Sequence, residues 1–158
     1  MNVSALVARC CCILGLAASL SMAQDQVQGI AADDAAMLAA INKARSTIKQ
    51  FFDAFAHPQL GQKAFLVKVA FTEDGQVEHI WLADLDFSAA KPKGVIANEP
   101  QLKKLRFKQT VQFDPAHISD WMYIDHDKVV GAYTTRVLRE RMSPEERKKF
   151  DLEAPYTF

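Results

Sequence analysis

Two alternating segments joined by a turn constrain the fold of this chain more than any other feature. In residues 64–71 every second side chain is apolar and bulky, whereas in residues 77–85 large apolar side chains occur at both odd and even positions. Asp74 and Gly75 between them are the residue types that tight hairpin turns prefer. A strand that is apolar on both faces is covered on both faces, so we expect the second segment to be an interior strand of a layered sheet.

A single amphipathic helix precedes this hairpin. Apolar residues recur every three or four positions from Met37 to Phe55, which is the spacing of one helix face. Asp33 or Asp34 can cap its start, and Pro58 ends it because the residue before a proline is driven out of helical geometry. We expect this helix to pack on one face of the sheet.

The rest of the chain predicts further strands and then short helices. Residues 110–113 and 118–124 have strand character, residues 94–97 form a short apolar run, and residues 143–146 form a capping box with proline at the first helical position. The economical fold is α+β. It has a mostly antiparallel sheet of four to five strands, a long N-terminal helix packed on that sheet and short C-terminal helices.

The chain begins with the pattern of a cleavable secretory signal peptide. Arg9 gives a positive flank, an apolar stretch spans residues 10–22, and Ala23 completes a small-residue cleavage motif. The stretch is shorter than the roughly 20 residues of a membrane span. We expect cleavage after Ala23, a flexible lead-in at residues 24–32 and one domain at residues 33–158. The mature chain is expected to be periplasmic or secreted, without stable insertion into a membrane.

Cleavage of residues 1–23 would remove all three cysteines, Cys10, Cys11 and Cys12. The mature chain would then have no thiol and no disulfide, which excludes cysteine nucleophiles, thiol redox pairs and thiolate metal sites. Because Arg9 directly precedes the cysteines, whereas a lipid-bearing cysteine follows the apolar core, we do not expect lipidation. Only Arg9 is lost among the charged residues, which leaves 18 basic and 19 acidic side chains from the 19 of each. A net charge near zero gives no case for nucleic acid as a partner.

Four segments, taken in order, resemble a known bacterial family. They are residues 78–82 (EHIWL), 94–100 (GVIANEP), 118–123 (ISDWMY) and 131–138 (GAYTTRVL). This set resembles the YegJ-like bacterial domain of unknown function, number 2314 in the DUF series, over roughly residues 35–138. The resemblance implies a small α+β module, exported in some members, and no activity that can be carried over residue by residue.

One departure from the family pattern lies before the predicted fourth strand. The pattern there has a glycine-aspartate turn, and this chain has Lys108 and Gln109.

The first candidate binding feature is a histidine beside a tryptophan. His79 and Trp81 share one face of the second strand, while Glu78 points to the other face. One interpretation is an imidazole that contacts a ligand beside an aromatic wall. The alternative is a histidine satisfied by one hydrogen bond under the helix.

The second candidate is an acid inside an apolar strand. If Asp120 is buried it needs a donor, and it could pair with Arg136 or His79 across the sheet. Such a pair could belong to a binding site or could be a structural ion pair.

Aromatic residues near Asp120 leave a further choice open. Trp121 and Tyr123 share the face opposite Asp120. If Trp81 joins them, they line an aromatic pocket, and otherwise they form a plain aromatic core. Together with polar residues of the neighbouring loop and helix, these features give the expected binding region: His79, Trp81, Asn98, Asp120, Trp121, Tyr133 and Arg136.

Metal and cofactor chemistry find little support in the sequence. The four histidines lack the spacing of metal ligands, so no metal is expected. Ser119 has no glycine on either side, unlike a serine in a nucleophile elbow, and the six glycines are scattered singly rather than forming a phosphate loop. No cofactor is expected.

The sequence favours a non-catalytic binding or interaction module of the cell envelope, whose partner is a protein or a small ligand. One alternative is a periplasmic immunity or inhibitor protein, which suits the size, the lack of a catalytic motif and the near-neutral charge. A second alternative is a cryptic hydrolase, which requires His79 and Asp120 to converge in one cleft.

Overall fold

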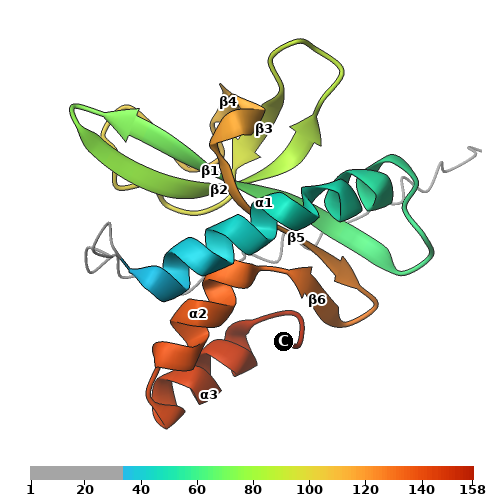
Figure 1. Ribbon diagram of the computed structural model, residues 1–158, viewed down its shortest axis with the longest axis vertical. Coiled ribbons are helices and arrows are strands. Elements are labelled where there is room, and N and C mark those ends of the chain that lie inside the picture. The colour runs from blue at the N-terminus through green and yellow to red at the C-terminus, as the bar shows by residue number, and fades with distance from the viewer. Residues whose placement is uncertain (1–33) are drawn as a thin grey trace, which may run out of the picture.

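An antiparallel sheet organises residues 34–158, the part of the chain that the computed structural model describes (Figure 1). The predicted signal peptide and lead-in lie outside these described residues. In chain order the elements are α1 (Ala35–Ala56), β1 (Gln62–Glu73), β2 (Gln76–Asp86), β3 (Lys93–Ile96), β4 (Thr110–Gln112), η1 (Pro115–His117), β5 (Ile118–Asp125), β6 (Lys128–Gly131), α2 (Tyr133–Arg141) and α3 (Pro144–Glu153). The structure therefore has the expected α+β architecture.

Helix α1 forms where the apolar spacing predicts it. Asp34 is its N-cap, and the Asp34 carboxylate accepts a hydrogen bond from the Met37 N–H group at 3.1 Å. The helix ends before His57. It lies across the sheet and contacts β5 most closely, where the indole N–H of Trp121 donates to the Ala44 carbonyl at 2.9 Å (Figure 1).

The β1–β2 hairpin is confirmed at its predicted turn. Glu73 pairs with Gln76, and the residues between them, Asp74 and Gly75, have φ values of 50° and 81°. Positive φ at both central positions matches the twist of a two-residue hairpin, which is why aspartate and glycine suit this turn. The strand order is β4-β3-β2-β1-β5-β6, so β2 is an interior strand as expected.

The sheet has six strands rather than the four to five predicted. The additional strand is β6, which pairs with β5 through a tight turn at His126. Gly131 ends β6 with φ of 80°, and a Cβ atom there would lie 2.3 Å from the Trp121 carbonyl oxygen. Only glycine fits this position.

The two faces of the sheet carry separate apolar clusters. The face under α1, which we call the helix face, has buried strand residues that pack with Ala44 and Phe51: Val67, Val69, Ile80, Leu82, Trp121 and Tyr123. The opposite face, which we call the tail face, has strand residues that pack with Tyr156 and Phe158 of the C-terminal tail: Leu66, Trp81, Met122, Ile124 and Val129. The tail is held beside β6, because the Val129 N–H group donates to the Thr157 carbonyl at 2.8 Å.

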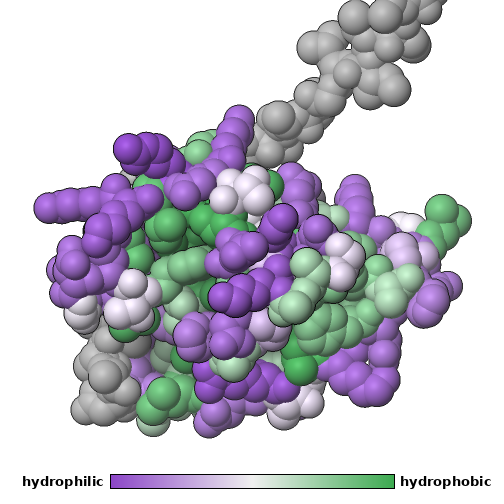
Figure 2. Space-filling view, turned by 90° about the horizontal axis from the view of Figure 1, so that it is seen from above, coloured by the Kyte–Doolittle hydropathy of each residue, from purple (hydrophilic) through white to green (hydrophobic). Residues whose placement is uncertain are grey.

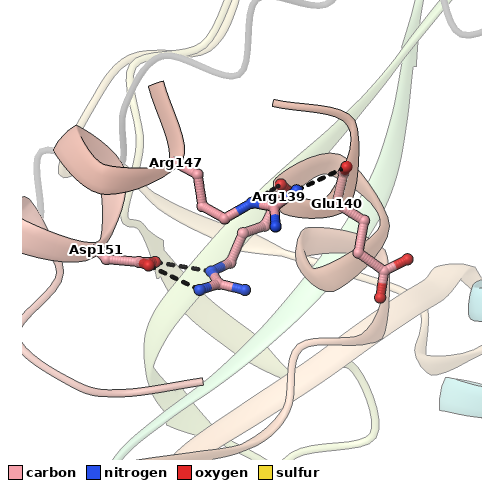
Figure 3. A network of polar contacts seen from close by, with 4 residues as sticks. All are labelled: Arg139, Glu140, Arg147 and Asp151. Atoms are coloured by element: carbon pink, nitrogen blue, oxygen red, sulfur yellow. Dashed lines mark hydrogen bonds and ion pairs between the residues drawn. The ribbon is translucent and has the colours of Figure 1, made fainter. Parts of the chain in front are cut away.

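Polar contacts fix α3 against α2 (Figure 3). Arg139 forms two hydrogen bonds of 2.7 Å with the two carboxylate oxygens of Asp151. Arg147 donates to the backbone carbonyls of Arg139 and Glu140 at 3.1 and 2.9 Å. The capping box predicted at the start of α3 is present between Ser143 and the third helical residue.

The surface of the described residues carries both hydrophilic and hydrophobic side chains (Figure 2). Figure 2 shows one face, on which hydrophilic side chains surround smaller hydrophobic patches. The large apolar side chains exposed within the described residues are Leu38, Leu60, Val77, Phe107 and Leu152. Among residues 34–158, no helix combines the length and apolar character required to cross a bilayer.

Candidate functional site

A continuous set of polar contacts crosses the tail face. His79 Nδ1 lies 2.7 Å from Ser119 Oγ, and Ser119 Oγ donates to the Lys68 carbonyl at 3.2 Å. The Lys68 ammonium group donates to Thr134 Oγ1 at 3.3 Å, and that hydroxyl donates to Asp120 Oδ2 at 2.6 Å. We call these five residues the polar network. They come from strands β1, β2 and β5 and helix α2.

A β-bulge brings two consecutive side chains of β5 into the polar network. Lys68 pairs with Asp120, but the next residue of β1, Val69, pairs with Ile118. Ser119 is therefore an extra residue in β5, and the regular alternation of faces is broken there. As a result, both Ser119 and Asp120 bond to residues of the network.

His79 is the exposed end of the polar network. The Ser119 hydroxyl has one proton, and the Lys68 carbonyl can only accept a hydrogen bond, so we infer that His79 Nδ1–H is the donor in the contact with Ser119 Oγ. On the neutral ring this leaves Nε2 without a proton. Nε2 makes no hydrogen bond with any residue of the described range 34–158.

The surroundings of His79 favour its neutral form. Although the residue as a whole is exposed, its ring is partly sunk into the sheet, and this burial is the main cause that lowers the pKa of His79 below 6.5. The positive charges of Lys68 and Arg45 lower that pKa further. At pH 7 the imidazole is therefore a neutral acceptor.

Asp120 caps helix α2 from a neighbouring strand. Its carboxylate accepts hydrogen bonds from the Tyr133 and Thr134 N–H groups at 3.1 and 2.7 Å, in addition to the Thr134 hydroxyl. Ala132, which precedes the helix, offers no side-chain oxygen for this purpose. Burial raises the pKa of Asp120, and the Thr134 hydrogen bonds and the Lys68 charge oppose that rise.

The aromatic residues divide between the two faces. Trp121 is fully buried on the helix face, where its ring stacks on Tyr123 and meets Tyr133 edge-on, with ring centroids 6.1 and 5.7 Å away. Trp81 lies on the tail face, with the Lys68 ammonium group 5.2 Å from its ring. Because Trp81 does not join Trp121 and Tyr123, the aromatic pocket does not form, and these rings are an aromatic core.

Asp120 pairs with neither Arg136 nor His79, the two partners that the sequence left open. Arg136 donates instead to the carbonyls of Gly131 and Val129, both at 2.9 Å, because it lies over the end of β6. His79 bonds to Ser119 rather than to Asp120. Arg136 and His79 therefore form hydrogen bonds with other groups. The Asp120 carboxylate bonds to α2 and lies near the Lys68 charge.

Asn98 is near the predicted region but serves the backbone. Its side-chain oxygen accepts a hydrogen bond from the Trp81 N–H group at 2.8 Å, which attaches the loop after β3 to the side of β2 that faces β3. Of the seven predicted site residues, the structure thus brings His79, Trp81, Asn98 and Asp120 to the neighbourhood of the polar network. It places Trp121 and Tyr133 on the other face and Arg136 beside the tail.

Three members of the polar network were missed by sequence reasoning: Lys68, Ser119 and Thr134. A signal existed for Lys68, because it is a single cation inside an otherwise apolar strand segment. Ser119 was considered only as a nucleophile. It is fully buried, so a substrate has no access to its hydroxyl. Within the part of the chain that the structure describes, no group of three or more histidine, cysteine, aspartate or glutamate side chains could hold a metal ion.

A family comparison decides which group of proteins this chain belongs to. Residues 34–158 match the family described as "Uncharacterized protein conserved in bacteria (DUF2314)". The chain belongs to this family. The resemblance over roughly residues 35–138 is thereby confirmed. No solved structure gives a significant match to this DUF2314 chain.

Two curated proteins are similar to this DUF2314 chain. "Uncharacterized protein YegJ" of Escherichia coli (strain K12) is 35% identical over 103 residues, which cover 65% of this chain and 66% of that protein. "Putative ankyrin repeat protein NMB1133/NMB1171" of Neisseria meningitidis serogroup B is 34% identical over 91 residues, which cover 54% of this chain and 36% of that protein. The matched segments thus span about two thirds of the first relative, 66%, and about a third of the second, 36%.

Proposed function

We propose that this DUF2314 protein is exported and that its domain is a non-catalytic interaction module of the cell envelope, which binds a partner protein through the tail face at His79. One observation carries the binding role. His79 is an exposed side chain whose orientation is fixed by buried Ser119, while its Nε2 atom has no partner within residues 34–158. A polar group that is already oriented loses little conformational entropy when it binds.

The surroundings of His79 support a contact surface. Val77 lies two positions earlier on the same face of β2, and 57% of its surface is exposed. Ala70, which pairs with His79 across the hairpin, is small and only partly buried. A neutral acceptor beside exposed apolar surface suits a protein partner that supplies one hydrogen-bond donor and an apolar side chain.

The same geometry argues against the cryptic hydrolase. A hydrolase would need His79 and Asp120 in one cleft, but within the described chain they are not hydrogen-bonded to each other. Asp120 and Ser119 are both fully buried and already bonded to neighbouring groups. Asp120 cannot approach a substrate without loss of the contacts that hold α2. Ser119 cannot do so without loss of its bonds to Lys68 and His79.

The export part of the proposal is supported by the sequence of residues 1–23. Expression in a bacterial host and fractionation of the cells would test it. We expect the protein in the periplasmic fraction, with an intact mass that corresponds to a first residue of Gln24. An uncleaved chain that remains in the cytoplasmic fraction would contradict export.

The binding role can be tested by capture from an envelope extract of the source bacterium. The baits are the wild-type protein, His79→Ala, and His117→Ala as a matched exposed histidine on η1. We expect at least one protein to be retained by the wild type and by His117→Ala and to be lost from His79→Ala. Purification of that protein and a direct titration would follow, with thermal melting of each bait as a control for folding. If the three baits retain the same proteins, the His79 surface is not the binding site.

A further inference from the structure

We propose that the loop of residues 103–109, which we call the basic loop, is a docking surface for an acidic segment of a partner protein. This loop contains four basic side chains and no acidic one: Lys103, Lys104, Arg106 and Lys108. By contrast, the basic residues of positions 136–149 are interleaved with glutamates. Because the whole chain has 19 basic and 19 acidic residues, the basic loop is a local concentration of positive charge. The proposal does not depend on a partner at His79.

Acidic side chains of the hairpin hold the start of the basic loop. The Glu78 carboxylate accepts hydrogen bonds from the Gln101 and Leu102 N–H groups, both at 2.9 Å. The Glu73 carboxylate accepts the Lys104 N–H group at 3.0 Å. Leu102 is buried, which anchors this part of the loop to the rest of the fold.

The end of the basic loop is held as well. The Arg106 N–H group donates to the Gln109 side-chain oxygen at 2.9 Å, and the Lys108 N–H group donates to the Ile96 carbonyl at 3.0 Å. The backbone is therefore fixed at both ends, and a ligand does not have to order it. This preorganisation favours a binding surface.

The side chains of the basic loop line an open hollow of about 620 Å³. Lys103, Arg106 and Lys108 have no carboxylate partner among residues 34–158, whereas Lys104 lies 3.6 Å from Asp74. Phe107 is 42% exposed between these cations, and the Lys108 ammonium group lies 5.3 Å from its ring. The hollow thus offers charge to carboxylates and an aromatic ring to an apolar group.

The shape and the border of the hollow favour a narrow acidic chain over a broad anionic surface. If the basic loop bound a bilayer or a nucleic acid, the highly exposed Asp74 carboxylate would lie close to phosphate groups, and the like charges would repel each other. A narrow peptide brings fewer anionic groups close to Asp74. Its carboxylates can pair with Lys103, Arg106 and Lys108, which have no carboxylate partner among residues 34–158. The hollow also ends at Gln109, directly before β4, which is the last strand of the sheet on that side. An extended acidic segment could continue along this edge by backbone hydrogen bonds.

The test is a fluorescence polarisation titration of the purified protein with a short labelled peptide of glutamate and alanine. The control peptide has glutamine in place of glutamate. The loop variant combines Lys103→Glu and Arg106→Glu, and its charge-matched control combines Lys148→Glu and Lys149→Glu on α3. We expect binding of the glutamate peptide that weakens with added salt, a loss of affinity of about tenfold or more in the loop variant, and little change in the control variant.

Three results would overturn the proposal. They are equal binding of the glutamine peptide, an equal loss in the α3 control, and retention by phosphatidylglycerol vesicles without binding of the acidic peptide. If the charge reversals unfold the protein, the combination of Lys103→Gln and Arg106→Gln replaces them and carries the same expectation of weaker binding.

Discussion

The two faces of the sheet are built from the same strands but are stabilised in different ways. The helix face is an aromatic and aliphatic core in which Trp121 contacts Phe51, Tyr123 and Tyr133. The tail face also buries apolar residues, but the polar network crosses it and ends at an exposed histidine. The helix face thus supplies packing energy, whereas the tail face positions α2 and one surface side chain.

The largest predicted effect is on the helix face. Trp121→Ala removes the centre of the aromatic core and the hydrogen bond to the Ala44 carbonyl. We expect a loss of about 3–5 kcal/mol in the free energy of unfolding, measured by urea denaturation. Val77→Ala, which truncates an exposed apolar side chain, is the control and is expected to change stability by less than about 0.5 kcal/mol. If Trp121→Ala cost no more than this control, the helix face would not be the main source of packing energy.

A smaller effect is predicted for Asp120 on the tail face. Asp120→Asn keeps the shape of the side chain but weakens the cap of α2 and leaves the Lys68 charge less well compensated. We expect a loss of about 2–3 kcal/mol, measured in the same urea experiment. The exposed Asp127→Asn is the matched control. An equal effect of the two substitutions would mean that the buried carboxylate does not hold α2.

A loss of about 1 kcal/mol is predicted for Ser119→Ala, because one hydroxyl and its hydrogen bonds are removed from the buried network. The substitution should also release the His79 ring from its fixed orientation. Its side-chain rotamers, followed by NMR couplings, should average more widely than in the wild type. An unchanged ring orientation would show that Ser119 does not position His79.

The smallest effect is a dependence of stability on pH. Because the pKa of His79 is lowered in the folded state, the unfolded chain takes up a proton first as the pH falls. The stability that neutral His79 provides is complete above pH 6.5, the ordinary pKa, and is lost as the pH falls from there through the lower pKa of the folded state. We expect the free energy of unfolding to decrease more steeply from neutral to mildly acidic pH in the wild type than in His79→Gln. The raised pKa of Asp120 has the opposite effect on stability, but Asp120 is present in both proteins, so its contribution cancels when the two pH profiles are compared. Parallel pH profiles would contradict the prediction.

The sequence predicted the architecture better than the site, and the reason is visible in particular residues. Helix α1 and the β1–β2 hairpin follow from local periodicity and turn chemistry. The polar network depends on a β-bulge at Ser119, which arises from the pairing of β5 with β1 and is not visible in an alternating pattern. Likewise, Lys68 meets Thr134 only because the fold brings together positions 66 residues apart.

One departure from the family pattern has a structural counterpart. Lys108, which stands where the family pattern has the glycine of a turn, has φ of 63°. This is the left-handed region, in which glycine is unstrained. Lys108 therefore has a backbone conformation that glycine would adopt without strain, and its side chain adds charge to the basic loop.

The tautomer and the pKa of His79 can be measured directly by long-range nitrogen–proton NMR spectra across a pH titration. We expect a neutral ring protonated at Nδ1, because Nδ1–H donates a hydrogen bond to Ser119 Oγ, and a pKa below 6.5. A neutral ring protonated at Nε2, or a pKa at or above 6.5, would contradict the claim that the buried network presents His79 Nε2 as an acceptor at the surface.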